Sequence, residues 1–135
     1  MPCWLVKSDP ETYAFDDLVR ERRARWDGVA NALALRHLAT MRPGDEVLVY
    51  ESGKVKAAVG RARVVSAPYP DPAVGDPKRL VIDLEAGPRL PRPVTLAAVR
   101  AEPAFAAFEL VRQSRLSVMP VPDALWKRLL AMGGG

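Results

Sequence analysis

The chain has 135 residues and a mass of 14.8 kDa, which suffices for one domain with a buried core but not for two ordinary ones. Its 49% hydrophobic and 27% charged residues exclude a disordered chain, and its net charge of +4 permits attraction to phosphate groups without identifying a partner. A single cysteine, Cys3, excludes an internal disulfide and, with a single distant histidine, His37, argues against a structural zinc site and a thiol nucleophile.

The first forty residues predict a strand and two helices. Residues 2–7 form a short strand that is apolar on both faces and hence central, and Ser8-Asp9-Pro10 ends it. Residues 15–22 predict a helix with two aspartates at its N-terminal end. Residues 30–41 predict a second helix with one apolar stripe. Asn31 projects from the middle of that stripe, so its amide needs a neighbour, a water or a ligand as a partner.

The middle of the chain predicts strands. Residues 46–51 and 57–66 form two strands joined by a tight turn at 52–54, and arginines alternate with apolar residues in the second, so one of its faces is wet. Residues 68–72 form a stiff, polyproline-like loop. Residues 80–86 show the cleanest alternation in the chain and predict a further strand.

The last third mixes short helices with one more strand. Residues 88–93 are irregular, Thr95 caps a helix that runs to residue 100, and residues 104–111 form another short helix. The polar–apolar alternation of residues 113–118 predicts a strand. The final helix starts after residue 121 with a proline in its first turn and ends at a glycine.

This order of elements predicts one α+β domain spanning residues 1–135. Five to six short strands are interrupted by helices, and hairpin-like connections outnumber crossovers. We therefore expect a mixed, mostly antiparallel, barrel-like sheet surrounded by short helices.

Donors and acceptors crowd the end of the first strand, at Lys7-Ser8-Asp9, and Trp26 can supply an aromatic wall beside them. Such a pocket suits a planar, hydrogen-bonding ligand such as a nucleobase, and stacking on Trp26 would contribute about 1–3 kcal/mol. The alternative is that Trp26 is a core residue like Trp4 and Trp126, with the Ser8 hydroxyl bonded to its own turn and Lys7 in water.

Several motifs resemble, in the same order, those of EVE-domain proteins of the PUA-like superfamily, and they cover essentially the whole chain. They are Trp4-Leu5-Val6-Lys7-Ser8-Asp9-Pro10, Trp26-Asp27-Gly28-Val29, Tyr69-Pro70-Asp71-Pro72, Pro91-Arg92-Pro93-Val94-Thr95-Leu96 and Arg112-Gln113-Ser114-Arg115-Leu116-Ser117-Val118. A more distant likeness to YTH reader domains lies in Leu5-Val6-Lys7-Ser8, Trp26 and Glu51-Ser52-Gly53-Lys54. The resemblance implies a PUA-like barrel that recognises a base, often a modified one, turned out of a nucleic-acid strand.

The resemblance and the residue types together indicate a set of contact residues. The candidates for nucleobase binding are Lys7, Ser8, Trp26, Asp27, Asn31, Ser52, Gln113, Arg115 and Ser117. Weaker candidates for phosphate contacts are Arg61, Arg63 and Arg112. Each has a plain structural alternative: Asn31 braces the loop after Trp26, Ser52 is a turn residue, Arg115 is buried and paired with Asp27 or Asp9, and Arg61 and Arg63 belong to a solvated strand face.

The chain also departs from the EVE pattern at the rim of the expected pocket. The family places an arginine before the asparagine of the Trp-Asp-Gly-Val segment and Tyr-Gln-Ala-Arg after it, whereas Ala30 precedes Asn31 here and Ala32-Leu33-Ala34-Leu35 follows. Met119 stands where the family often has glutamine. These changes remove polar and aromatic groups and bear on the identity of the ligand more than on the fold.

Three functions follow from these observations. The leading one is a non-catalytic module that binds a modified base flipped out of single-stranded RNA or DNA, without cofactor or metal. The alternative is a small amidohydrolase acting on modified nucleosides, with Lys7 and an acidic partner (Asp9, Glu51 or Asp27) as its catalytic pair. A third is an accessory protein that binds another protein through the proline-rich loop.

The expected location is the cytoplasm. The chain starts without a basic leader or an apolar run, and its longest strongly apolar stretch, residues 47–50, is too short to span a bilayer. We therefore expect no membrane partner, and we favour a monomer.

Overall fold

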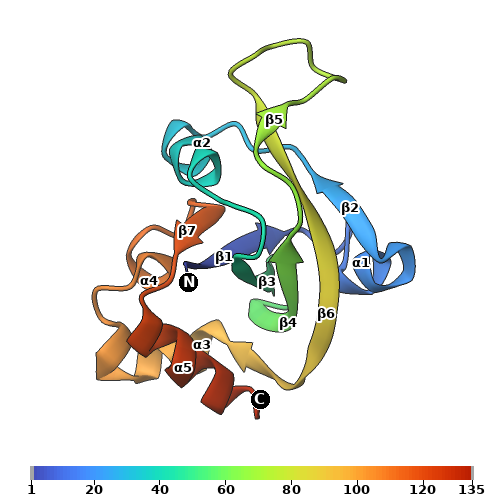
Figure 1. Cartoon of the computed structure of the whole chain (residues 1–135). Coiled ribbons are helices and arrows are strands. Elements are labelled where there is room, and N and C mark those ends of the chain that lie inside the picture. Colours follow the sequence, from blue (N-terminus) through green and yellow to red (C-terminus); the bar gives the residue numbers. More distant parts are fainter. Residues whose placement is uncertain (1, 135) are drawn as a thin grey trace.

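The computed structural model describes residues 2–134 and shows a curled, mixed β-sheet with short helices around it (Figure 1). The strands are β1 (Cys3–Ser8), β2 (Arg23–Trp26), β3 (Glu46–Glu51), β4 (Ala57–Val64), β5 (Tyr69–Pro70), β6 (Leu80–Thr95) and β7 (Val118–Pro120). The helices are α1 (Phe15–Glu21), α2 (Ala32–Ala39), α3 (Leu96–Ala101), the 3₁₀ turn η1 (Pro103–Phe105), α4 (Glu109–Arg112) and α5 (Asp123–Met132). None of the helices within residues 2–134 has the length and apolar character needed to cross a membrane.

The sheet has the predicted character. Its strands lie in the order β2-β6-β4-β3-β1-β7, and β5 pairs with the start of β6. Of the strand pairs in the described residues, β1 with β3 is parallel and the others are antiparallel. The α+β class and the mostly antiparallel, barrel-like sheet are therefore confirmed, with seven strands where the sequence predicted five or six.

Strand β1 is central because its side chains are apolar on both faces. Trp4, Leu5 and Val6 are at most 5% exposed, and the strand pairs with β3 on one side and β7 on the other. The chain then turns back on itself, since the amides of Thr12 and Tyr13 both donate to the Asp9 carbonyl, at 3.0 and 2.8 Å. The end of β1 is thus held in place by its neighbouring strands and is followed by a tight turn.

The buried carboxylate of Asp45 anchors β1 to the start of β3. It is 2% exposed and accepts hydrogen bonds from Trp4 Nε1 at 3.0 Å and from the Arg42 amide at 2.9 Å. Trp4 and Trp126 are both 5% exposed, which confirms that they are core residues.

We expect Asp45→Ala to lower the free energy of unfolding by about 3 kcal/mol, because it leaves the buried indole N–H of Trp4 without a partner and removes two charge-assisted hydrogen bonds. Urea denaturation of the variant measures the loss. Asp76→Ala removes an exposed carboxylate that, within the described residues, accepts only from the Lys78 amide, at 2.9 Å, so it is the control and should change the value by less than about 1 kcal/mol. A loss at Asp45 no larger than that of the control would contradict this role.

The prediction that residues 88–93 are irregular is wrong, because β6 continues to Thr95. Prolines normally interrupt a central strand, but here β6 pairs with β4 at Ala86, Arg89 and Val94, and the three prolines of the segment fall between these paired residues. The register shifts on both sides of Gly60 let the strand bend past them. Each proline therefore lies at a position where the pairing of β6 with β4 requires no hydrogen bond from a main-chain N–H.

The predicted strand at residues 113–118 is also wrong over most of its length. Residues 113–116 form a turn, with the Leu116 amide donating to the Gln113 carbonyl at 3.0 Å, and β7 begins only at Val118. The strand is this short because β7 pairs with β1 only from Val6 back to Trp4. Gln113, Arg115 and Ser117 consequently do not share a strand face.

Asn31 precedes its helix instead of projecting from the apolar stripe. It is exposed, and its side-chain oxygen accepts from the Ala34 amide at 3.0 Å, so it is the N-cap of α2. The prediction that its amide faces inward is wrong because the helix starts later than expected.

The other predicted helix caps agree with the structure: Thr95 accepts from the Ala98 amide at 3.1 Å, and Gly133 ends α5. The predicted helix at 104–111 divides into η1 and α4.

Helix α1 is held against the sheet by one ring and one carboxylate. Phe15 is 1% exposed and its ring lies over Gly60 of β4. Glu51, at the end of β3, accepts from the Phe15 amide at 2.8 Å and is 8% exposed. The start of α1 is thereby fixed beside the ends of β1 and β3.

Candidate nucleic-acid interface

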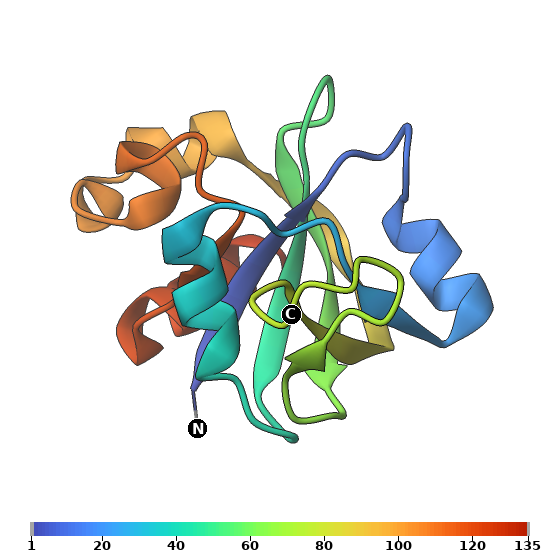
Figure 2. The same cartoon turned by 90° about the horizontal axis from the view of Figure 1, so that it is seen from above.

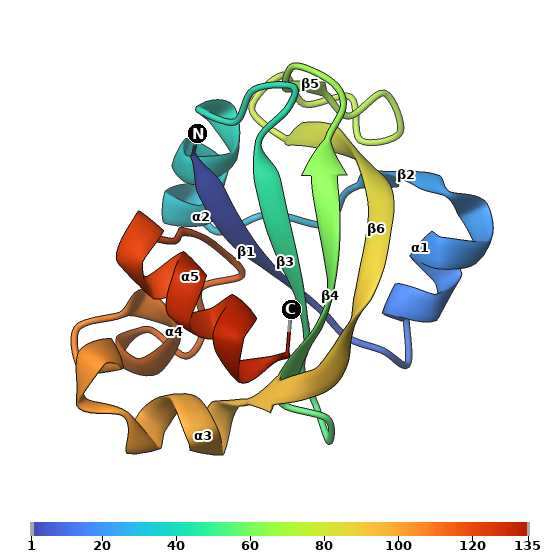
Figure 3. The same ribbon diagram turned by 60° about the horizontal axis from the view of Figure 1, so that its bottom comes forward.

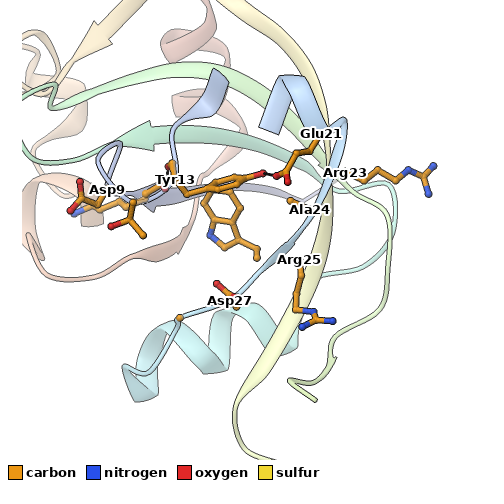
Figure 4. A pocket seen from close by; sticks show the side chains of 12 residues that line it. Asp9, Tyr13, Glu21, Arg23, Ala24, Arg25 and Asp27 are labelled. Carbon is orange, nitrogen blue, oxygen red and sulfur yellow. Dashed lines mark hydrogen bonds between the residues drawn. The ribbon is translucent and has the colours of Figure 1, made fainter. Parts of the chain in front are cut away.

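A cavity of about 550 Å³ opens beside the end of β1, between the turn that follows it, the end of α1 and the strand β2 (Figure 4). We call it the aromatic cavity. It is lined by Lys7, Ser8, Asp9, Thr12, Tyr13, Glu21, Arg23, Ala24, Arg25, Trp26, Asp27 and Gly28. The structure thus brings together four of the predicted contact residues, namely Lys7, Ser8, Trp26 and Asp27.

Two aromatic rings form one wall of the cavity. The ring centroids of Tyr13 and Trp26 are 6.1 Å apart and the rings meet edge to face at 83°. Trp26 is the last residue of β2, pairs with Ile82 of β6 and is 7% exposed, so most of its indole packs in the core, as its structural alternative expected, while part of it lines the cavity. Tyr13 donates through its hydroxyl to the Glu21 carboxylate, as Figure 4 shows. Burial and this hydrogen bond raise the pKa of Tyr13, so the phenol stays neutral and its ring stays in place.

Polar groups lie around these two rings, and some of them already form hydrogen bonds within the protein while others do not. The Ser8 hydroxyl donates to the Tyr13 carbonyl, which is the local turn bond that the sequence offered as the alternative role of this residue. The Asp9 carboxylate accepts from the Glu11 amide at 3.0 Å. Asp27 is exposed at the rim, and no hydrogen bond or ion pair is found for its carboxylate within residues 2–134 (Figure 4). The Asp27 carboxylate is therefore an acceptor still open to a ligand.

Lys7 lies at the inner end of the cavity and is half-buried. Its Nζ donates to the Ser114 carbonyl at 2.8 Å and lies 5.6 Å from the centroid of the Tyr50 ring. Burial lowers the pKa of the ammonium group. Among residues 2–134 no carboxylate forms an ion pair with it.

We expect the Lys7 ammonium to titrate at a lower pH than is usual for a lysine side chain. Between the lowered pKa and the usual lysine value the unfolded chain binds more protons than the folded one. The contribution of Lys7 to the free energy of unfolding therefore rises with pH across that window and is lost as the pH falls through the lowered pKa. NMR titration of the Lys7 ¹³Cε resonance measures its midpoint, and a midpoint at or above the usual lysine value would contradict the burial effect.

The two arginines of β2 form the outer rim, and each is supported from a neighbouring strand or loop. Arg23 pairs with Glu85 of β6 at 3.0 Å. Arg25 lies 3.6 Å from the nearly buried carboxylate of Asp71, and a hydrogen bond with Tyr69 is the main cause of its raised pKa. The Tyr69-Pro70-Asp71-Pro72 motif thus holds the rim of the cavity.

The remaining predicted contact residues lie outside the aromatic cavity. Asn31, Arg112, Gln113 and Arg115 line a separate hollow of about 330 Å³, beside the segment between β2 and α2 that passes over β1 in the view from above (Figure 2). Arg115 is exposed and pairs with neither Asp27 nor Asp9 in the described residues, so its expected burial is wrong.

Two of the predicted contact residues, Ser52 and Ser117, form hydrogen bonds with the main chain of β1. Ser52 donates to the Ser8 carbonyl through its amide at 2.8 Å and through its hydroxyl at 3.2 Å. The Ser117 carbonyl accepts from the Lys7 amide at 2.9 Å. Both residues hold the end of β1 in position beneath the cavity.

The arginines of β4 are already paired. Arg61 bonds Glu46 at 2.9 Å and Arg63 bonds Glu85 at 3.1 Å. Their guanidinium groups belong to the solvated sheet face, which was the structural alternative that the sequence offered for these two arginines.

Sequence reasoning missed Tyr13, Glu21 and Arg25. The signal for Tyr13 was present, since an aspartate–proline break three residues before an aromatic residue is a turn that folds the ring back over the strand end. Glu21 lies at the end of α1 and bonds Tyr13, whereas Arg25 lies on β2 and reaches Asp71 through the pairing of β2 with β6, which no local pattern gives.

The comparisons with known proteins identify the family. The family model of the EVE domain matches residues 2–132. This chain belongs to the EVE-domain family. The EVE resemblance stated from the motifs is thereby confirmed. No curated protein sequence matches the chain.

Solved structures share this EVE fold over nearly the whole chain. An NMR structure of a Rhodopseudomonas palustris protein is 41% identical, with a TM-score of 0.94 over 99% of this chain and 94% of that one. A crystal structure of an Agrobacterium tumefaciens protein is 33% identical, with the same TM-score and the same coverage of both chains. Human THYN1, crystallised with DNA containing 5-methylcytosine, is 24% identical, with a TM-score of 0.90 over 100% of this chain and 99% of that one, a likeness that shows the fold alone.

Proposed function

We propose that this EVE-domain protein is a non-enzymatic reader that binds a modified base, flipped out of single-stranded DNA or RNA, in the aromatic cavity. The observation that carries the proposal is the joint lining of one 550 Å³ cavity by the Trp26–Tyr13 wall, by an unpaired carboxylate and by a half-buried lysine. An aromatic surface with a few convergent polar groups is the usual design of a site for a planar ligand.

A nucleic-acid partner is supported by the human relative, which was crystallised with 5-methylcytosine-containing DNA. That complex also makes 5-methylcytosine the first modification to test here. A single strand is the easier substrate because extruding a base from a duplex costs a few kcal/mol of stacking and pairing.

The amidohydrolase alternative gains no support from the lysine that was to carry it. Lys7 donates to a main-chain carbonyl, while Glu51 accepts from the Phe15 amide and Asp9 from the Glu11 amide. Asp27 has no partner in the described residues, and Lys7 is not paired with it. The lysine–carboxylate pair that general base catalysis would use is therefore not assembled.

The proposal is tested by mass spectrometry of nucleosides and oligonucleotides that co-purify with the protein. A reader should enrich one modified nucleoside relative to total cellular nucleic acid. Enrichment of none, together with conversion of added modified nucleosides, would replace the reader by the enzyme.

The Asp27 carboxylate can accept a hydrogen bond from the exocyclic amino group of cytosine or 5-methylcytosine, a group that thymine lacks. We therefore expect Asp27→Ala to reduce the preference for these two bases over thymine by about 1–3 kcal/mol. Non-specific affinity should not fall, since a negative charge has been removed near the phosphates. Fluorescence anisotropy with matched oligonucleotides measures both. Asp123→Ala, which makes the same charge change on α5, should leave the preference unchanged; an unaltered preference in Asp27→Ala would remove the residue from the site.

A further inference from the structure

A second hollow, of about 540 Å³, lies beside the aromatic cavity at the end of the β3–β4 hairpin. We call it the cationic hollow. Its charged lining residues are Lys7, Lys54, Lys56 and Arg100, and none of its lining residues within 2–134 carries a carboxylate. Figure 3 shows where these residues come from: the β3–β4 turn and α3 lie together at one end of the sheet, and the loop before β6 lies at the opposite end.

Within residues 2–134, three of the four cations of the cationic hollow have no side-chain partner, whereas Lys7 donates to the Ser114 carbonyl. Arg61 and Arg63 of β4 and Arg25 of β2 are each matched by a carboxylate. Within residues 2–134, Lys54 and Lys56 are exposed and neither side chain forms a hydrogen bond or an ion pair. Arg100 is likewise exposed and unpaired in these residues; burial raises the pKa of Tyr50, which also lines the hollow, and the Arg100 charge opposes that rise. Uncompensated like charges gathered in one concave site attract an anion.

The backbone holds one of these lysines in an unusual conformation. Lys56 has a φ of 48°, a left-handed value that residues with a side chain seldom adopt. Its carbonyl accepts from the Leu96 amide at 2.8 Å, which ties the start of β4 to the start of α3. Lys56 and Arg100 both line the hollow, and backbone held in a sparsely populated conformation is often found at functional sites.

The cationic hollow and the aromatic cavity are neighbours through shared residues. Lys7 lines both, and Ser52 of the hollow donates to the carbonyl of Ser8 in the cavity at 2.8 Å. β1 and β3 run parallel with Lys7 beside Tyr50, so both sites open at the same end of these two strands. A ligand with a planar group in the cavity and anionic groups alongside would occupy both.

We propose that the cationic hollow binds the phosphate groups of the nucleic-acid strand whose base enters the aromatic cavity. This inference rests on the proposed function. In this arrangement the aromatic cavity, with Trp26, distinguishes one base from another. Lys54, Lys56 and Arg100 bind the phosphates whatever the sequence of the strand.

The test measures the binding of single-stranded DNA oligonucleotides with one cytosine or one 5-methylcytosine across a series of salt concentrations. In Lys54→Gln/Lys56→Gln we expect both strands to bind more weakly by the same factor. The slope of log K against log salt should become shallower by about 1.4, since each single-strand phosphate contact contributes roughly 0.7. Lys54→Arg/Lys56→Arg should restore the wild-type slope. Lys78→Ala/Arg79→Ala, on the loop at the other end of the sheet, removes the same charge and should leave the slope unchanged.

The outcomes separate this inference from the reader function. A wild-type slope in the glutamine variant, or an equal loss in the control, would overturn the phosphate assignment while leaving selective binding in the cavity intact. If neither strand binds the wild type, the reader proposal fails in this form. Tripolyphosphate binding that the glutamine variant then loses would show that the hollow takes a free phosphate ligand, which also overturns its assignment to a strand.

Discussion

Replacing Trp26 with alanine is expected to weaken binding of a strand with a modified base by about 1–3 kcal/mol, roughly 5- to 150-fold, and to remove the preference for the modification. The indole is part of the lining of the aromatic cavity, and a base stacked on an aromatic ring contributes that amount. The rings of Tyr13 and Trp26 stand at 83° to each other, so the Tyr13 ring does not replace the plane of the indole once the indole is gone.

The control must account for stability, because Trp26 is only 7% exposed and its truncation leaves a void that costs about 3–5 kcal/mol. Trp26→Phe keeps an aromatic face and should retain part of the binding. Trp126→Ala truncates a tryptophan of α5 that is 5% exposed and does not line the cavity, and should lower the melting temperature while folded protein still binds. Equal binding by folded Trp26→Ala and wild type in calorimetric titration would refute the stacking role.

Replacing Gly60 with alanine is expected to lower the free energy of unfolding by about 2–3 kcal/mol. A Cβ at this position would overlap the ring of Phe15, which is 1% exposed and cannot move without displacing α1. Because α1 carries Glu21, the partner of Tyr13, the displacement should also loosen the aromatic wall.

A double-mutant cycle measures the cause of that loss. Phe15→Leu in the Gly60→Ala background replaces the flat ring by a smaller side chain, so the double variant should be less destabilised than the sum of the two single changes. Chemical denaturation of the four proteins gives the coupling energy. Strict additivity would mean that the ring is not what excludes a side chain at position 60.

The strength of the sequence analysis lay in local patterns. The apolar run ending at Lys7, the alternation of β4 and the capping residues Thr95 and Gly133 all predicted elements at nearly the observed bounds. Side-chain period and cap chemistry are properties of a few neighbouring residues, so they can be read without the fold. The motif order added the family, and with it the association of Trp26 with the end of β1.

The errors arose where tertiary pairing overrides local preference. Prolines argued against a strand at 88–93, yet the β4 ladder leaves their positions unpaired. The alternation at 113–118 resembled a strand, but only three residues find a partner in β1, and Arg115 therefore lies in a turn. The cationic hollow combines the β3–β4 turn with α3 across some forty residues of chain, a juxtaposition that no sequence window contains.

The most direct test of the base-binding cavity is an NMR titration that follows the three tryptophan indole N–H signals while single-stranded DNA with one 5-methylcytosine is added. We expect the Trp26 signal to shift or broaden in proportion to binding, while the Trp4 signal, bonded to Asp45, and the Trp126 signal stay nearly fixed. Saturable binding that leaves the Trp26 signal unchanged would place the strand elsewhere and contradict the assignment of the aromatic cavity.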